Sequence, residues 1–321
     1  MDYTDTRHHY IPQFYLRGFS IPKREDNVWV YDHGKKNPYA ANVSKVGQKR
    51  AYYTAIMKDG TKDARLEKHF GDIESNAAPV IRKLLAEDAT LSEDEHIHLM
   101  SFAAHIFCRV PRYREWMERF ASDLARNMVK MSVLHSGRLE RQYAEWEAQG
   151  KEPAAPMEEF RNFILDDDAY TLDPHPNLAL VGMVHSAVGV LEHLLEMKWV
   201  FIRPREASYF ITSDNPYTMI RPGQPMGAPV GLAMNDIEVT FPLGSGLCMV
   251  GRWDGLEGFH YVNHNVVTML NYRTLGHTHK YAYAGYRDEY WTKLLNMIPT
   301  RARAKTPAPD IAHNPMSHGD I

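Results

Sequence analysis

Two stretches far apart in this 321-residue chain carry side chains whose types could do chemistry. His9 stands in the first, and an imidazole gains or loses a proton near neutral pH. Asp214 stands in the second, where a carboxylate after a strand could act as a general base or bind a divalent metal ion. The sequence therefore predicts His9 and Asp214 as catalytic residues, provided that the fold brings the two stretches together.

A third group of candidates centres on Arg109. It lies at the end of an apolar helical stretch, and a buried arginine needs a carboxylate or a phosphate beside it. Glu74, on the preceding predicted helix, is the candidate carboxylate. A structural Arg109–Glu74 pair is one interpretation and an anion-binding Arg109 is the other, and we include Glu74 among the predicted catalytic residues.

Polar neighbours of these residues form the predicted substrate-binding set. We expect arginine side chains to neutralise the charge of the substrate and amide side chains to orient it. A Ser-Asp-Asn-Pro sequence is also typical of a turn, in which short polar side chains bond to nearby backbone amides. The serine has no G-x-S-x-G context, which disfavours α/β-hydrolase chemistry. The predicted substrate-binding residues are Gln13, Arg17, Arg109, Ser213 and Asn215.

Metal and nucleotide motifs are weak or missing in the sequence. His96 and His98 would point in different directions from a helix, and His277 and His279 would need further ligands. The two cysteines form no C-x-x-C pair, and no Walker A or G-x-G-x-x-G loop is present. The cofactor is unknown from the sequence, and a divalent metal is possible.

Charge is distributed unevenly along the chain. The formal net charge is -3, yet residues 1–70 carry 13 basic and 8 acidic side chains. A basic, aromatic-rich beginning suits a nucleic acid or a phosphate-bearing small molecule, although a solvated surface explains it as well. The N-terminal sequence has no apolar leader, and no run of eighteen apolar residues occurs. We therefore expect a cytoplasmic protein with no membrane partner, and the oligomeric state stays open.

The elements that must position these residues change in type along the chain. Short strand patterns, such as residues 27–32 and 51–55, come first, helical periodicity follows, and strand patterns return after Lys198. This order favours an α+β fold, a predominantly helical bundle with a small mixed β-sheet formed from N-terminal and C-terminal strands. We expect one compact domain over residues 1–299, with segments 1–60, 61–198 and 199–299, and a flexible tail over 300–321.

Three local features of the predicted helices can be checked. Pro79 predicts a kink or a break in the helix that begins near Asp63. Ser92 followed by Glu95 predicts a capping box. Residues 178–197 are apolar almost all round, so we expect that helix in the centre of the structure.

Four motifs follow one another along the chain. They are HYIPQFYLRGFS at 9–20 with VWVYD at 28–32, ESNAAP at 74–79, CRVPRYR at 108–114, and YFITSDNP at 209–216 with FPL at 241–243. Together they resemble a bacterial family, domain of unknown function 4238, over residues 9 to about 284. The resemblance implies no agreed activity, but it implies that the segments of His9, Glu74, Arg109 and Asp214 matter jointly. His105 stands where relatives would be expected to carry Gln or another polar residue, which argues against a catalytic role for it.

Three functions remain open from the sequence. The leading one is a nuclease-like hydrolase that acts on nucleic acid or another phosphate-bearing substrate. His8-His9-x-x-Pro12 resembles the start of HNH nucleases, but no strand convincingly precedes His9 and the later Asn and His of that motif are not evident. The alternatives are a non-catalytic nucleic-acid- or ligand-binding protein and, from family impression, a component of a bacterial defence or toxin system.

Overall fold

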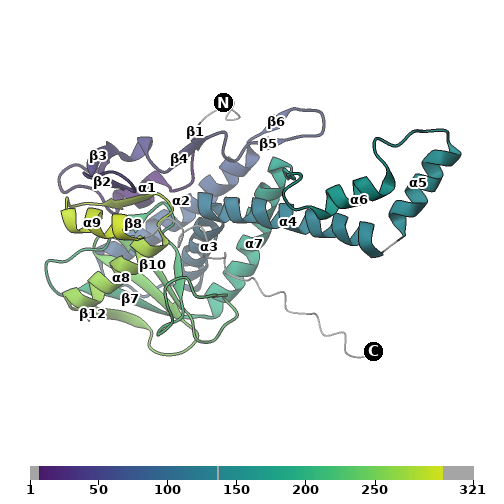
Figure 1. Ribbon diagram of the computed structural model, residues 1–321. Helices are drawn as coiled ribbons and strands as arrows, with labels where there is room; N and C mark the ends of the chain where they lie inside the picture. Colours follow the sequence, from purple (N-terminus) through teal and green to yellow (C-terminus); the bar gives the residue numbers. More distant parts are fainter. Residues whose placement is uncertain (1–6, 136, 299–321) are drawn as a thin grey trace. The chain divides into compact units, whose positions relative to one another are not determined.

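The structure, a computed structural model, describes residues 7–135 and 137–298 and is an α+β fold (Figure 1). The chain divides into two compact units. The first unit takes the residues up to Arg114 and those from Leu180 onward, and the second takes residues Glu115–Ala179. All of the predicted site residues belong to the first unit.

The larger sheet of the first unit has five strands in the order β12-β7-β11-β10-β9. Only the β12–β7 pairing is parallel, so this sheet is mixed. Every residue of β10 is buried, which is typical of a central strand covered on both faces. The strands are β7 (Lys198–Pro204), β9 (Thr218–Ile220), β10 (Glu238–Gly244), β11 (Leu247–Arg252) and β12 (Gly258–Val262).

A four-stranded sheet joins the two ends of the chain, in the order β3-β2-β13-β8. The prediction that N-terminal and C-terminal strands share a sheet is confirmed here, but this sheet is antiparallel throughout rather than mixed. Tyr31, Ile211 and Ala282 bury their side chains in one apolar cluster beneath it. The strands are β2 (Asn27–Asp32), β3 (Tyr39–Asn42), β8 (Thr212–Ser213) and β13 (Tyr281–Ala284).

Two short antiparallel strand pairs complete the N-terminal region. β1 (Arg7–His9) pairs with β4 (Gln48–Arg50), and β5 (Ala55–Ile56) pairs with β6 (Lys62–Asp63). The strand predicted over residues 51–55 is wrong, because residues 51–53 form a turn. Ala51 has a φ of 51°, in the left-handed region, and this conformation ends the extended chain after Arg50.

Helices of the first unit follow the predicted order. Pro79 lies inside the unbroken helix α2, so the predicted break is wrong. The apolar face of α2, with Ala77, Val80, Ile81 and Leu84 buried, offsets the loss of one backbone hydrogen bond. The predicted capping box of Ser92 and Glu95 is confirmed at the start of α3.

The remaining helix bounds of this unit complete the description. They are α1 (Gln13–Arg17), the 3₁₀ helix η1 (Val43–Lys45), α2 (Arg65–Ala86), α3 (Glu93–Arg109), α8 (His264–His277) and α9 (Glu289–Met297). α2 packs against α3, and α1 lies against both η1 and β10. The predicted tail from residue 300 lies outside the described residues.

The second unit is helical. It contains most of α4 (Pro111–His135), all of α5 (Arg138–Ala148) and α6 (Met157–Leu165), and the first residues of α7 (Pro176–Glu196). Val133, Leu139 and Ile164 form its small apolar core. A core of this size leaves much of each helix exposed to solvent.

Helix α7 differs from its prediction. Ala179, Met183 and Ala187 are buried, but Val181 and Val188 on another face are 53% and 56% exposed, so the helix is not central. The sequence pattern failed because small alanines, rather than the larger aliphatic residues alone, form much of the packed face. Within the described residues, α7 is long and apolar enough to cross a membrane by length and composition, with 33% of its most apolar window buried.

Candidate functional site

The opening stretch and the Ser213–Asn215 stretch lie side by side in the first unit. The Tyr15 hydroxyl, on α1, donates a hydrogen bond of 2.7 Å to the carbonyl oxygen of Pro242. It also lies 2.7 Å from the Thr212 hydroxyl on β8. Burial raises the pKa of Tyr10, and the nearby charge of Asp214 raises it further. Tyrosines, rather than His9, therefore make the contact between the two stretches.

Asp214 is buried and its carboxylate is fully bonded. Its Oδ1 accepts from the amide of His279 at 2.8 Å, and its Oδ2 accepts from the amides of Lys280 and Tyr281 at 2.8 and 2.9 Å. Burial raises the pKa of Asp214, while the charge of His279 and the three amides oppose that rise. Both oxygens hold the turn between α8 and β13, so this geometry favours a positioning role for Asp214.

Ser213 and Asn215 extend the same network. The Ser213 hydroxyl accepts from the Asn215 amide at 3.1 Å, and Asn215 Nδ2 donates to the carbonyl oxygen of His277 at 2.8 Å. Ser213 is fully buried and Asn215 is nearly so. We call Ser213, Asp214, Asn215 and residues 277–281 the Asp214 loop, and its bonds match the turn interpretation of the sequence.

Arg109 lies at the end of α3 and is 1% exposed. Its Nη1 forms an ion pair of 2.9 Å with Glu74 on α2, which confirms the predicted pair. Its Nε donates to the carbonyl oxygen of Tyr10 at 3.2 Å, and the guanidinium lies over the Phe70 ring. Arg109 Nη2 is buried and has no hydrogen-bond partner in the described part of the chain. One end of the guanidinium is therefore available to bind an anion.

The two neighbouring histidines of β1 have different surroundings. His8 is buried, and its Nδ1 accepts a hydrogen bond of 2.9 Å from the Tyr53 amide, which fixes Nδ1 without a proton. Burial lowers the pKa of His9 and the positive charge of Arg109 lowers it as well, while hydrogen bonding of the ring to the backbone of Ser44 and Val43 partly opposes the fall. His9 is therefore neutral at neutral pH, and within residues 7–135 and 137–298 its buried Nε2 has no partner.

Glu67 lies near the same arginine. Burial raises its pKa, whereas the charges of His8 and Arg109 lower it. Its Oε2 is buried and forms no hydrogen bond with the residues that the structure describes. We call His8, His9, Glu67, Glu74 and Arg109 the Arg109 cluster. Three of its members carry buried polar atoms without partners among the described residues, and the charge of Arg109 acts on the pKa of both His9 and Glu67.

His105 lies next to this cluster, but in the described part of the chain it has no buried nitrogen that lacks a hydrogen-bond partner. Its Nδ1 lies 2.7 Å from the carbonyl oxygen of Ser101, and its ring centre lies 5.6 Å from that of His69. Burial, with the charge of Arg109 adding to it, lowers the pKa of His105 to about 4. His105 is therefore a neutral packed side chain near pH 7.

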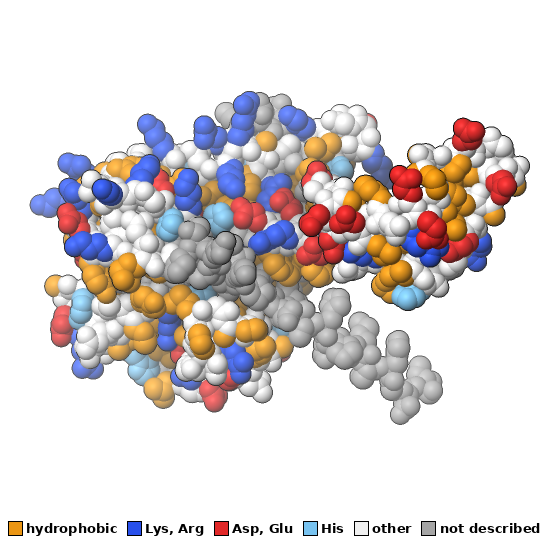
Figure 2. All heavy atoms as spheres, in the orientation of Figure 1, with side chains coloured by type: hydrophobic (Ala, Val, Ile, Leu, Met, Phe, Trp, Pro, Cys, Tyr) orange, Lys and Arg blue, Asp and Glu red, His pale blue; other side chains and the backbone are white. Residues whose placement is uncertain are grey.

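Two predicted substrate-binding residues, Gln13 and Arg17, lie on α1, whereas Arg109 lies on α3. Arg17 is 47% exposed on its side chain and pairs with Asp26 at 2.8 Å. Gln13 begins α1 and is half-buried. Lys and Arg side chains gather over the N-terminal region in Figure 2. Lys49 and Arg50 of β4, the strand that pairs with β1, are exposed. The surface near β1 therefore carries positive charge that would attract an anion.

Sequence reasoning missed two members of the Arg109 cluster, Glu67 and His8. Glu67 lies seven residues before Glu74 on α2, so both carboxylates share one helix face, and this spacing could have found it. The sequence predicted His9 rather than His8 as a site residue. Alternation along a strand places neighbouring side chains on opposite faces, but it does not tell which face is buried.

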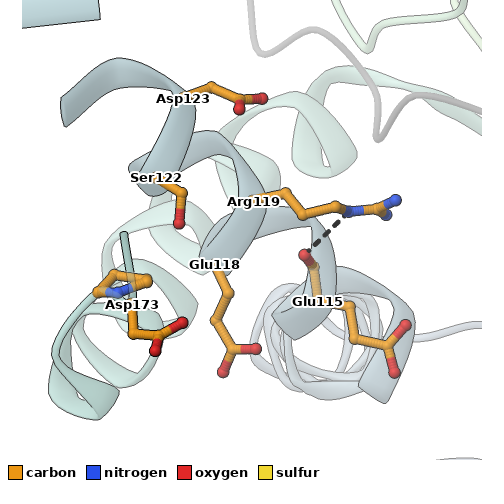
Figure 3. Close-up of a pocket in the computed structure, with 7 residues that line it drawn as sticks. Glu115, Glu118, Arg119, Ser122, Asp123 and Asp173 are labelled. Carbon is orange, nitrogen blue, oxygen red and sulfur yellow. Dashed lines mark hydrogen bonds between the residues drawn. The ribbon is translucent and has the colours of Figure 1, made fainter. Parts of the chain in front are cut away.

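A polar pocket in the second unit is a competing candidate. It has a volume of about 490 Å³, and Glu115, Glu118, Asp123 and Asp173 contribute four carboxylates to its wall (Figure 3). Arg119 Nε donates to the carbonyl oxygen of Glu115 at 3.2 Å. The negative charge of this pocket would repel a phosphate. The basic surface near β1 is therefore the better candidate for a phosphate-bearing ligand. Across the described ranges, no group of three or more His, Cys, Asp or Glu side chains is arranged to hold a metal ion.

Comparisons with known proteins give a family and nothing beyond it. No curated protein and no solved structure matches the chain. A family model described as Protein of unknown function (DUF4238) matches residues 7–288. That range contains both the Arg109 cluster and the Asp214 loop. The chain therefore belongs to the DUF4238 family, as its sequence motifs predict.

Proposed function

We propose that this protein is a hydrolase that binds a phosphate-bearing substrate, either a nucleic acid or a small molecule, at the Arg109 cluster. One observation carries the proposal: among the residues that the structure describes, Arg109 Nη2, His9 Nε2 and Glu67 Oε2 are buried polar atoms without partners, and the charge of Arg109 acts on both other side chains. Buried polar atoms are nearly always bonded, so several unbonded ones together point to a ligand that completes them.

Each of these three unbonded atoms has a chemical role in such a site. Arg109 Nη2 donates to a phosphate oxygen, and the Glu74 pair holds the guanidinium in place. His9, neutral because burial lowers its pKa, accepts a proton from the attacking water. Glu67, whose pKa burial raises, delivers a proton to the leaving oxygen. The opposite shifts of the two pKa values support the assignment of His9 as base and Glu67 as acid.

The Asp214 loop supports this site indirectly. Tyr10 offers its carbonyl oxygen to Arg109, and its side chain lies within the field of Asp214. Asp214 then fixes the surroundings of Tyr10 instead of touching the substrate. We therefore propose His9 and Glu67 as catalytic residues, Glu74 and Asp214 as positioning residues, and Arg109 as the substrate-binding residue.

The first test separates binding from structure. We expect inorganic phosphate, pyrophosphate or a short oligonucleotide to raise the melting temperature of the protein, and added salt to weaken that effect. Arg109→Gln should abolish the ligand-dependent rise. Arg17→Ala is the matched control, because it removes an arginine of the same N-terminal region that is exposed and paired with Asp26.

The second test separates catalysis from binding. Hydrolysis of a chromogenic phosphodiester and of labelled DNA and RNA would be measured with the wild type, His9→Gln and Glu67→Gln. We expect each substitution to lower turnover by about a hundredfold or more while the ligand-dependent rise in melting temperature persists. Binding without turnover in the wild type would instead indicate a non-catalytic binding protein. An absence of phosphate binding would contradict the proposal.

A further inference from the structure

Helix α4 presents an apolar stripe to solvent in the second unit. Large side chains at Phe120, Leu124, Met128, Met131 and Leu134 are each between 49% and 63% exposed. Figure 2 shows hydrophobic side chains along this unit, interspersed with charged ones. Isolated exposed apolar residues are ordinary, but a continuous stripe of this size on one helix marks an interaction surface.

The spacing of the stripe has a specific form. Phe120, Leu124, Asn127, Met131 and Leu134 follow one another at steps of four, three, four and three residues. Such steps form the seam of a two-helix coiled coil, and a single polar residue within a seam specifies one register. We call these five residues the α4 seam. Its spacing fits another helix with the same repeat.

We propose that the α4 seam pairs with the α4 seam of a second copy of this chain, with the two helices antiparallel about a twofold axis near Arg126. In this register Phe120 packs against the partner's Met131, and Leu124 packs against the partner's Asn127. The symmetric pairing satisfies the requirement that one surface patch serves both subunits. The two Asn127 side chains then lie about one turn apart, close enough to bond to each other.

Charge beside the seam selects this arrangement. Asp123 is exposed on one flank, and Lys130 lies on the same flank two turns further along. An antiparallel partner places Asp123 opposite the partner's Lys130, and the twofold axis forms the pair twice. A parallel partner would place Lys130 beside the partner's His135 and leave Asp123 beside the partner's Met128. Lys130 also bonds Asp167 at 2.6 Å, which holds its side chain on that flank.

The exposed area is sufficient for a dimer. The four apolar side chains of the α4 seam and the neighbouring Met128 each expose about half of their surface, on the order of 500 Å² in total. Two copies would bury on the order of 1,000 Å² from these side chains alone, near the lower limit for a specific interface. We therefore expect a dimer with a dissociation constant in the micromolar range.

Sedimentation of the full chain over a concentration series tests the pairing. We expect a reversible dimer, and Leu124→Glu with Met131→Glu should raise the dissociation constant at least about tenfold. Val129→Glu is the matched control, because Val129 is an exposed apolar residue on the opposite face of α4. It should leave the dimer unchanged. A monomer at every concentration, or equal effects of the seam and control variants, would overturn the proposal.

Cross-linking tests the direction of the helices. A mixture of Phe120→Cys and Met131→Cys chains should form disulfide-linked pairs under mild oxidation, whereas Met131→Cys chains alone should not. The native Cys108 and Cys248 are buried, so their background is low. Self-linking of Met131→Cys in preference to the mixed pair would indicate parallel helices and overturn the antiparallel arrangement. Circular dichroism checks that every variant keeps its helices, and phosphate binding is measured separately because it does not depend on this surface.

Discussion

The Asp214 loop and the Arg109 cluster each bury one charged side chain, yet they differ in how completely that charge is bonded. Asp214 uses both carboxylate oxygens on three backbone amides. Arg109 uses its Nε and Nη1, while Nη2 has no partner among the described residues. A fully bonded buried charge stabilises the fold, and a partly bonded one retains capacity for a ligand.

The comparison also separates two uses of a buried ion. The Asp214 carboxylate meets only main-chain donors, so its bonds depend on the backbone path of residues 279–281. The Arg109 guanidinium meets a side chain on another helix, Glu74, and an aromatic ring, Phe70. Substitutions should therefore affect stability most strongly in the Asp214 loop and ligand binding most strongly in the Arg109 cluster.

The largest expected effect is that of Asp214→Ala. The substitution removes a buried carboxylate and leaves three part-buried amides without their acceptor, so we expect the free energy of unfolding to fall by about 3 kcal/mol. Chemical denaturation measures this loss. Asp214→Asn keeps one carbonyl oxygen as an acceptor and should cost less. A loss below about 1 kcal/mol for Asp214→Ala would show that the loop does not depend on this carboxylate.

Arg109→Gln should have a smaller effect on stability and a larger one on binding. Glu74 is 26% exposed on its side chain and can be rehydrated, so we expect a loss of about 2 kcal/mol. Denaturation with and without phosphate would distinguish the two regions. Phosphate should stabilise a mildly destabilised Asp214→Asn protein but not the Arg109→Gln protein. If phosphate stabilised the two variants equally, the proposed difference between the Asp214 loop and the Arg109 cluster would be wrong.

Acidification should destabilise the surroundings of Arg109. The pKa of His105 is lowered to about 4 in the folded protein, whereas an unfolded histidine titrates near pH 6.5. The unfolded chain therefore gains a proton first, so the stabilisation is complete above about pH 6.5 and is lost as the pH falls towards 4. This site accounts for at most about 3 kcal/mol of that loss.

A titration of stability against pH checks this assignment to His105. The slope between pH 6.5 and 4 should be shallower in His105→Gln than in the wild type. An unchanged slope would assign the pH dependence to other buried groups, of which His277, with a pKa also lowered to about 4 by burial, is the first candidate.

The smallest expected effect is that of Arg17→Ala. Arg17 and Asp26 form an exposed ion pair, and such pairs contribute less than about 1 kcal/mol. We expect neither stability nor phosphate-dependent stabilisation to change measurably in thermal melts. A clear loss of phosphate binding would extend the binding surface beyond the Arg109 cluster to the exposed face of α1.

Much of the fold could be predicted from local patterns. The strand over Asn27–Asp32 was predicted from its alternation, and the capping box at Ser92 was predicted from two residues. These features depend on side chains close in sequence. The break that was one of the two outcomes predicted at Pro79 does not occur, and the central position predicted for helix α7 is wrong, because packing against the rest of the fold decides whether a helix continues through a proline and which of its faces is buried.

The candidate site was predictable only in part, for the same reason. The Arg109–Glu74 pair follows from the rule that a buried cation needs a partner, and the structure contains it. The sequence could not tell that Asp214 would meet three backbone amides, because those amides belong to residues 279–281. The sequence also could not tell which of His8 and His9 is the more buried, since only the position of β1 in the fold decides which ring is buried.

The four-stranded sheet has a consequence for synthesis of the protein. Its inner strands pair Trp29–Asp32 with Tyr281–Ala284, so the first strand of this sheet to leave the ribosome waits for the last one. At about 5–20 residues per second, that delay is roughly ten seconds to a minute. The edge of β2 that later pairs with β13 stays unpaired during this time, and an unpaired strand edge is open to pairing with another chain.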